Sequence, residues 1–135
     1  MDSVIYIPGD LTAPVFERGG DLARGAGYVV SVARRTAGGE VEIHDCETDT
    51  FHVLEGSATF VTGGTVVGRH TVAPGQHRGT AIEGGETCQL RSGDVIIIPE
   101  GTPHWFKDVA GTIRYYVVKA VSAPATAPDP DSGPR

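Results

Sequence analysis

The chain has little of what builds a disulfide framework or a membrane anchor. Its 135 residues include only two cysteines, Cys46 and Cys88, with one methionine and one tryptophan. The cysteines lie far apart without Cys-x-x-Cys spacing, so we expect both to be free thiols. No stretch of the sequence approaches the run of about eighteen apolar residues that a membrane-spanning helix needs, and we expect no such helix.

Basic residues are also scarce. Lysine and arginine number 11 against 17 aspartates and glutamates, which gives a formal net charge of −6. Because nucleic acids and anionic membranes attract clusters of basic side chains, this balance argues against either as the main partner. Residues 1–3 include an acidic side chain and are not followed by an apolar signal core, so we expect a cytoplasmic protein.

Glycine and proline, by contrast, are abundant, with 19 and 9 residues. Turn-forming residues separate short apolar runs, and only the weakly patterned segment 11–22 offers room for a short helix or an arm. Many short strands at near-regular spacing predict one all-β domain, a sandwich or a barrel. The strand-like runs occupy residues 4–7, 28–32, 41–44, 51–54, 58–61, 87–91, 95–98 and 113–121.

The stretch 93–108 carries the most specific pattern in the chain. It reads glycine, five residues, proline, one residue, glycine, two residues, histidine, and three residues later an aspartate. This order and spacing resembles the second motif of the cupin family, with aspartate in place of the family's final asparagine. The anchors are Gly93, Pro99, Gly101, His104 and Asp108. The resemblance implies a single cupin, a jelly-roll-like β-barrel of short antiparallel strands.

The residue types within this motif agree with that fold. A glycine turn leads into a strand whose three isoleucines we expect to fill the barrel wall. Pro99 and Gly101 then predict a tight corner, because proline fixes φ and glycine tolerates positive φ. We expect His104 to follow that corner and to point inward, with Phe106 on the same face and Trp105 on the opposite one.

The family's first motif is matched more loosely. Residues 49–56 resemble its end, which places Asp49 where the family has a glutamate, His44 at its second histidine and Glu42 at its first. Glu42 and His44 are two residues apart on one strand, so their side chains share a face. Aspartate is one methylene shorter than glutamate, which makes Asp49 the weakest of these positions.

The two motifs together imply a metal centre formed by Glu42, His44, Asp49 and His104. Carboxylate oxygens and imidazole nitrogens both bind divalent ions, and we expect Zn, Mn, Fe or Ni. The alternative is a metal-free pocket in which His44 and His104 act as acid and base. Tyr115 and Tyr116 point to opposite faces of the last strand, and we take Tyr115 as the candidate that lines the barrel and donates a proton.

Several enzyme activities are known on this fold, and the resemblance does not choose between them. We expect a metal-dependent enzyme with isomerase-, lyase- or cyclase-like proton transfer on a carbonyl or acidic metabolite. The alternatives are a dioxygenase that uses non-haem iron and a non-catalytic small-ligand binding or sensor protein. The substitutions in the first motif also allow a structural role.

The resemblance further implies a homodimer. Val41 and Ile43 are apolar on the face opposite Glu42 and His44, as expected for a strand that is covered on both sides. We divide the chain into an N-terminal arm or edge strand at 1–25, the barrel at 26–121 and a flexible tail rich in proline and alanine at 122–135. The glycine-rich stretch 65–86 is expected to be an excursion that borders the site.

The remaining polar residues receive no firm role from the sequence. His52 differs in strand parity from Asp49, so we expect it to face outward. His70 and His77 lie in the excursion and are expected either to be solvated or to cap the pocket mouth. Arg78 is either an exposed arginine or a group at the rim that binds an anionic substrate.

Overall fold

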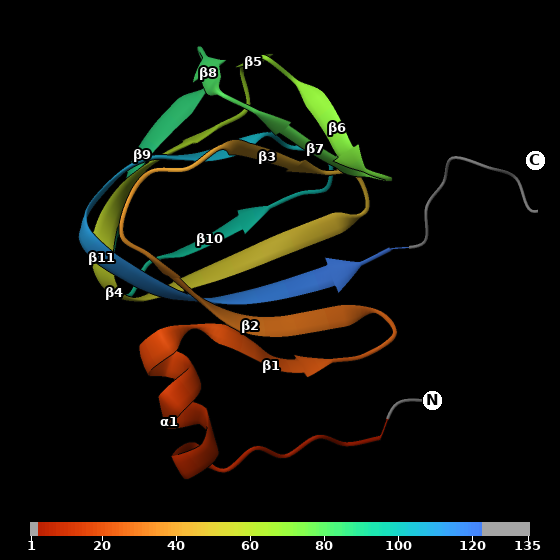
Figure 1. The fold of residues 1–135 in the computed structure, drawn as a ribbon, viewed down its shortest axis with the longest axis vertical. Helices are drawn as coiled ribbons and strands as arrows, with labels where there is room; N and C mark the ends of the chain where they lie inside the picture. Colours follow the sequence, from red (N-terminus) through yellow and green to blue (C-terminus); the bar gives the residue numbers. More distant parts are fainter. Residues whose placement is uncertain (1–2, 123–135) are drawn as a thin grey trace, which may run out of the picture.

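A computed structural model describes residues 3–122 of the chain (Figure 1). Over this range the chain forms one helix, α1, and eleven strands. Residues 123–135 of the expected tail lie outside the described residues. The elements in chain order are α1 (Gly9–Arg18), β1 (Gly20–Arg24), β2 (Tyr28–Arg35), β3 (Val41–His44), β4 (Glu47–Thr62), β5 (Thr65–Val67), β6 (His70–Ala73), β7 (Gln76–Gly79), β8 (Ala81–Glu83), β9 (Glu86–Arg91), β10 (Val95–Ile98) and β11 (His104–Val121).

The strands pair antiparallel and confirm the predicted all-β architecture. One sheet has the order β1-β2-β11-β3-β7-β6, and its long strand β4 pairs with β9, β10 and β11. The 16-residue β4 and the 18-residue β11 bend along their length, so the sheet curls round on itself (Figure 1). This curvature places the inward faces of β2, β3, β4 and β11 opposite one another and encloses the site.

The excursion expected at 65–86 is folded more regularly than the sequence suggested. Its outer parts, β5 and β8, form a separate two-stranded sheet, and β7 pairs with both β3 and β6. Gly68, Gly75 and Gly84 occupy the turns between these strands and have positive φ, whereas Gly79 ends β7. Residues 65–86 therefore extend the barrel wall beyond β3.

The interior is filled by two groups of apolar side chains. The larger group contains an aromatic cluster, in which the ring centroids of Phe51 and Tyr115 lie 4.8 Å apart and those of Phe60 and Phe106 lie 4.7 Å apart. The smaller group contains Val41, Ile43, Val61 and Ile82, with Val66 and Trp105 packed against it.

This smaller group changes the interpretation of β3. Val41 and Ile43 are fully buried, as predicted for a strand covered on both faces. Ile82 on β8 and Val66 on β5 supply the cover, so the chain itself buries this face. The apolar side of β3 is therefore no evidence for a partner subunit.

All three isoleucines of β10 were expected to face the core, but one of them does not. Ile98 is 2% exposed, whereas Ile97 and Val95 are 63% and 60% exposed. Successive side chains of a strand point to opposite faces, so only Ile96 and Ile98 can face inward. The expectation that Ile97 fills the barrel wall is wrong.

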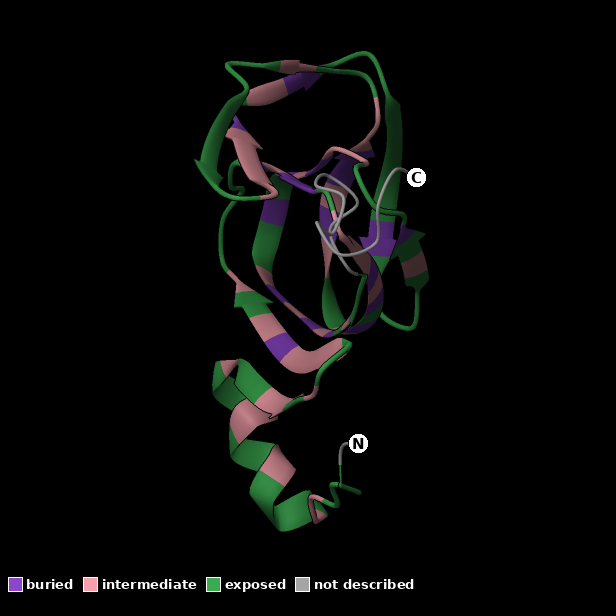
Figure 2. Ribbon diagram, turned by 90° about the vertical axis from the view of Figure 1, so that its right-hand side faces the viewer, coloured by how far each residue is buried: buried purple, intermediate pink, exposed green. Residues whose placement is uncertain are grey.

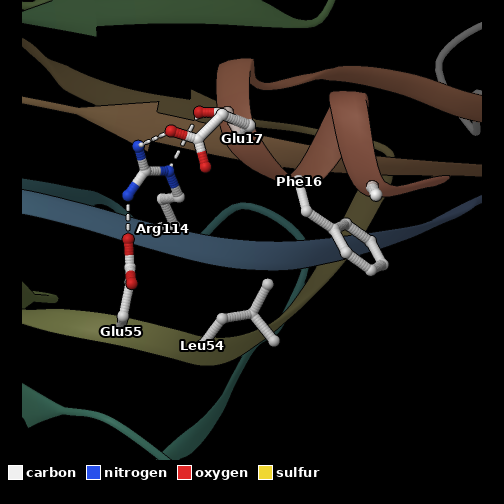
Figure 3. Close-up of a pocket in the computed structure, with 6 residues that line it drawn as sticks. Phe16, Glu17, Leu54, Glu55 and Arg114 are labelled. Carbon is white, nitrogen blue, oxygen red and sulfur yellow. Dashed lines mark hydrogen bonds and ion pairs between the residues drawn. The ribbon is translucent and has the colours of Figure 1, made fainter. Parts of the chain in front are cut away.

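Helix α1 lies against the outside of the barrel, and none of its residues is buried (Figure 2). Phe16 contacts Tyr116 of β11 edge to face at 5.1 Å. Arg114 reaches from β11 to the Glu17 carbonyl, at 3.0 Å, and to the Glu55 carboxylate of β4 (Figure 3). These contacts hold the helix over the sheet beside a surface pocket of about 350 Å³. No histidine or cysteine lines that pocket.

No helix within residues 3–122 is long and apolar enough to cross a membrane.

Candidate metal centre

The corner before β11 connects the two motifs directly. Gly101 has a φ of 74°, which favours glycine, and its N–H donates to the carbonyl of His44 at 2.8 Å. His104 begins β11 and pairs in register with Glu42 of β3. The second motif is thereby held against β3, and His104 points into the barrel as predicted, with an exposure of 4%.

Three of the predicted ligand residues come together inside the barrel. One ligand atom from each of His44, Asp49 and His104 lies within 4.8 Å of the others. Asp49 Oδ2 is 3.7 Å from His44 Nε2 and 3.8 Å from His104 Nε2. Asp49 is 1% exposed, and its shorter side chain does reach the two histidines. The shorter side chain therefore does not keep Asp49 from the histidines, and its role as a metal ligand stays a prediction.

The hydrogen bonds of the two histidines aim Nε2 of each ring at this cluster. His104 Nδ1 lies 3.1 Å from the carbonyl oxygen of Thr102, and His44 Nδ1 contacts Oε1 of Gln76. A carbonyl oxygen only accepts, so each Nδ1 donates its proton. In a neutral ring this leaves a lone pair on Nε2, which is the arrangement that metal-binding histidines use.

These donors fit a divalent ion. Metal–nitrogen and metal–oxygen bonds of about 2.0–2.2 Å allow two ligand atoms to lie up to about 4.4 Å apart. The separations of 3.7 and 3.8 Å between Asp49 Oδ2 and the two Nε2 atoms fall within this limit. Two histidines and one carboxylate would also leave coordination positions for water or a substrate.

Glu42 lies beside this cluster. Its Oε1 is 3.8 Å from His44 Nε2, but its Oε2 is 3.0 Å from Arg35, and Arg78 approaches Oε1 at 3.7 Å. Burial alone would raise the pKa of the Glu42 carboxyl, but the neighbouring cations and histidines lower it overall. A carboxylate held by two arginines is less available as a ligand, and its predicted role as a fourth ligand stays a prediction.

Two cations in the barrel were not anticipated from the sequence. Arg35 donates to Glu42 and, through Nε, to the Tyr115 hydroxyl at 3.0 Å. Lys119 Nζ lies 2.9 Å from Asp49 Oδ1 and 3.1 Å from Glu47 Oε1. For Lys119, the alternation of side chains along a strand could have indicated this position, because it falls four residues after Tyr115 and therefore on the same face.

Burial by itself lowers the pKa of the Lys119 ammonium, yet the hydrogen bond and charge of Asp49, together with Glu47, raise it above the usual 10.5. Lys119 therefore stays charged at neutral pH. Since Gln76 Nε2 also donates to Glu47 Oε2 at 3.3 Å, a continuous chain of contacts runs from His44 through Gln76, Glu47 and Lys119 to Asp49.

Tyr115 lines the cavity as predicted, while Tyr116 faces outward to α1. Burial raises the pKa of the Tyr115 hydroxyl, although the Arg35 charge opposes this. Because the Tyr115 oxygen accepts the Arg35 Nε proton, its own proton is free to point at a bound molecule.

The cavity in front of the cluster has a volume of about 190 Å³. Its lining comes from β2, β3, β4 and β11 and combines charged, aromatic and small side chains. The lining residues are Ser31, Ala33, Arg35, Glu42, His44, Asp49, Phe51, His104, Tyr115, Val117 and Lys119.

The other predicted polar residues lie away from the cluster. His52 is exposed on the outer face of β4, as expected from its parity. His77 contacts both carboxylate oxygens of Asp45 at 3.0 Å, and His70 Nδ1 lies 2.9 Å from the Gly68 carbonyl oxygen. Arg78 reaches Glu42, which places it at the edge of the site.

We expect Gln76→Ala to weaken divalent-metal binding by roughly tenfold, because His44 loses the acceptor that fixes its ring and tautomer. Isothermal titration with Mn²⁺ measures the change. Gln89→Ala, at an exposed position of β9 that bonds Thr59, is the matched control. Equal affinities for the two variants would contradict a role for Gln76 in orienting His44.

The free energy of unfolding should depend on pH through the protonation of His104. Burial lowers its pKa below the usual 6.5, although the Thr102 carbonyl and nearby carboxylates oppose this. The unfolded chain then binds a proton before the folded one, so stability is complete above about pH 6.5 and falls as the pH drops. Urea unfolding of the metal-free protein between about pH 8 and pH 5 measures this loss. His104→Gln should flatten the dependence and His52→Gln should not; an unchanged slope in His104→Gln would refute the assignment.

We compared the chain with known proteins by sequence and by structure. No protein-family model and no curated protein matches the sequence. Among solved structures, BH2720 from Bacillus halodurans is similar, with a TM-score of 0.60 and 16% identity over 91% of this chain and 86% of that one. The cupin domain of Cnp3 from Schizosaccharomyces pombe has a TM-score of 0.56 and 17% identity over 77% of this chain. The DMSP lyase DddQ from Ruegeria pomeroyi has a TM-score of 0.51 and 20% identity over 76% of this chain.

The match covers only part of two of these structures. This chain covers 60% of the Cnp3 structure and 42% of the DddQ structure. At these identities the likeness concerns the fold, and it agrees with the spacing of Gly93, Pro99, Gly101 and His104 and with the antiparallel barrel. The chain thus has the fold of a small cupin domain.

Proposed function

We propose that this cupin domain is a metal-dependent enzyme that transfers a proton on a small acidic or carbonyl-containing molecule. The observation that carries the proposal is the buried cluster of His44, Asp49 and His104, with Nε2 of both rings aimed at one carboxylate oxygen. A divalent ion bound there would supply Lewis acidity that polarises a carbonyl or carboxylate of the substrate.

The size of the cavity limits the substrate. The cavity volume of about 190 Å³ lies below the roughly 300–1,000 Å³ of pockets that hold drug-sized ligands. This suits a compact metabolite and excludes a polymer or a large aromatic cofactor from the inner site.

The charges of the lining favour an anion. Arg35 and Lys119 balance Glu42 and Asp49 among the cavity-lining residues. A bound divalent cation would give this lining a net positive charge and attract a negatively charged ligand.

The protein groups placed to move a proton are Tyr115 and Glu42. The Tyr115 hydroxyl keeps its proton because burial raises its pKa, and its bond from Arg35 fixes its oxygen. Glu42 is ionised and lies on the same wall of the cavity as His44, so it is the proton acceptor in this proposal. His44 and His104 act as ligands and orient the reacting group.

Proton transfer is tested by deuterium exchange. The metal-loaded protein is incubated in D₂O with a panel of small hydroxy, keto and dicarboxylic acids, and NMR follows incorporation of deuterium and product formation. We expect at least one compound to exchange, and Tyr115→Phe to slow that exchange by about 100-fold or more. Compounds that bind and are recovered unchanged and undeuterated would contradict an enzyme and indicate a binding or sensor protein.

A second candidate, a non-haem iron dioxygenase, is favoured by the composition of the cluster. Two histidines and one carboxylate are the ligand set of many iron(II) oxygenases. Oxygen consumption by the Fe²⁺-loaded protein in the presence of the same compounds separates the two activities, because proton transfer consumes no oxygen.

We also propose that the domain forms a homodimer through the outer face of β10, β4 and β11. Val95 and Ile97 are 60% and 63% exposed, and Val118 of β11 is 41% exposed. Thr50 of β4 pairs with both Ile97 and Val118, so the three strands carry a continuous strip on this face. Exposed apolar strips of this kind favour association.

We expect sedimentation velocity at micromolar concentration to show a dimer, and Ile97→Glu to shift it to a monomer. Thr59→Glu, at a partly exposed position of β4 away from β10, is the control that keeps the dimer. A monomeric wild-type protein would contradict this assembly.

A further inference from the structure

Lys119 occupies an unusual place beside the candidate metal centre. Its ammonium group lies between Asp49 Oδ1, at 2.9 Å, and Glu47 Oε1, at 3.1 Å. The other oxygen of Asp49, Oδ2, faces the Nε2 atoms of His44 and His104. One buried carboxylate therefore holds a protein cation on one oxygen and presents the other to the histidines.

This arrangement has two electrostatic consequences. Without Lys119, no lysine or arginine among the described residues would pair with Asp49, and an uncompensated carboxylate with 1% exposure is costly in a folded protein. With Lys119, a divalent ion that uses Oδ2 must share Asp49 with a positive charge one carboxylate away. Like charges a few ångströms apart in a partly buried site repel strongly, because the effective dielectric constant is far below that of water.

We propose that Lys119 is an internal counter-cation: it compensates Asp49 in the metal-free protein and weakens the affinity of the site for divalent metal. The proposal rests on the metal site proposed above for His44, Asp49 and His104. It implies a protein that folds without metal and exchanges its metal readily, which sets it apart from domains that require metal to fold.

Glu47 modulates this effect. Its two oxygens hold Lys119 and Gln76, so part of the lysine's charge is neutralised away from Asp49. When glutamine replaces Glu47, Lys119 pairs with Asp49 as its only carboxylate and the site becomes more positive. The two residues should therefore shift metal affinity in opposite directions.

A purely positioning role for Lys119 predicts a different sign. If the lysine served only to orient Asp49, its loss would weaken metal binding by about 10- to 100-fold, as for other groups that orient metal ligands. The counter-cation role predicts tighter binding when the charge is removed. The direction of the change distinguishes the two roles.

The experiment measures Mn²⁺ and Zn²⁺ affinity by calorimetry and chelator competition, and thermal unfolding of the metal-free protein. The variants are Lys119→Met, which keeps the length without the charge, and Glu47→Gln, with Lys107→Met on the exposed part of β11 as control. His104→Ala supplies the background from other sites.

We expect Lys119→Met to bind metal about tenfold or more tightly than wild type while its metal-free form unfolds at a lower temperature. Glu47→Gln should bind metal more weakly, and it tests the proposal even if Lys119→Met fails to fold. Unchanged or weaker binding by Lys119→Met, or tighter binding by Glu47→Gln, overturns the proposal while leaving the metal site intact. Wild-type and variant proteins that bind no more metal than His104→Ala overturn both the metal site and this proposal.

Discussion

Replacing His44 or His104 with alanine is expected to reduce divalent-metal affinity by about 100-fold or more, which corresponds to about 2.7 kcal/mol. Each change removes one of the three converging ligand groups, and no other histidine within residues 3–122 joins the cluster to replace it. Calorimetric titration with Mn²⁺ measures the loss.

His52→Ala is the matched control because His52 is exposed on the outer face of the strand that carries Asp49. It should bind metal like the wild type. If His52→Ala and His104→Ala lose affinity equally, or if neither loses any, the metal is not held inside the barrel.

Gly56→Ala is expected to prevent folding or to lower the free energy of unfolding by about 3 kcal/mol or more. Gly56 has a φ of 88°, and a Cβ there would lie 2.1 Å from the Thr112 carbonyl oxygen and 2.8 Å from Ile113 Cα. Both contacts are with backbone atoms of β11, so neither can be relieved by a side-chain rotation. Since β4 and β11 carry Asp49 and Lys119, the strain would also reach the site.

Gly63→Ala separates this clash from the cost of positive φ alone. Gly63 has a φ of 74°, and nothing lies within 4 Å of a Cβ placed there. We expect a loss of about 1–2 kcal/mol, the usual cost of left-handed backbone for an L-residue. Urea unfolding monitored by circular dichroism compares the two variants, and equal losses would contradict the close approach of β4 and β11 at Gly56.

The parts of the fold that the sequence predicted well are those set by local chemistry. The spacing from Gly93 to His104 requires a turn, a strand and a corner in fixed order, and the structure has these elements. The counting that related Asp49 and His44 to the first motif also placed both side chains in the cluster. Positions defined by motif spacing carry information about one another even when they are distant in the chain.

The remaining features depend on long-range pairing. The strands β5 to β8 form because 65–86 folds back along β3, and no local signal specifies that partner. Alternation along the strand puts Ile97 on the face opposite Ile96 and Ile98, so its exposure could have been predicted. Three consecutive isoleucines were instead expected to be buried together. Strand parity put Lys119 on the face of Tyr115, but nothing in the sequence named Asp49 and Glu42 as the partners of Lys119 and Arg35, because these pairs form between different strands.

The most direct test of a metal centre is a crystal structure of the Mn²⁺-loaded protein with anomalous diffraction collected on the low- and high-energy sides of the manganese absorption edge. We predict one anomalous peak per chain inside the barrel, within about 2.3 Å of His44 Nε2, Asp49 Oδ2 and His104 Nε2. A peak only at His70 or His77, which lie away from the cluster, or no peak at all, would contradict the metal centre.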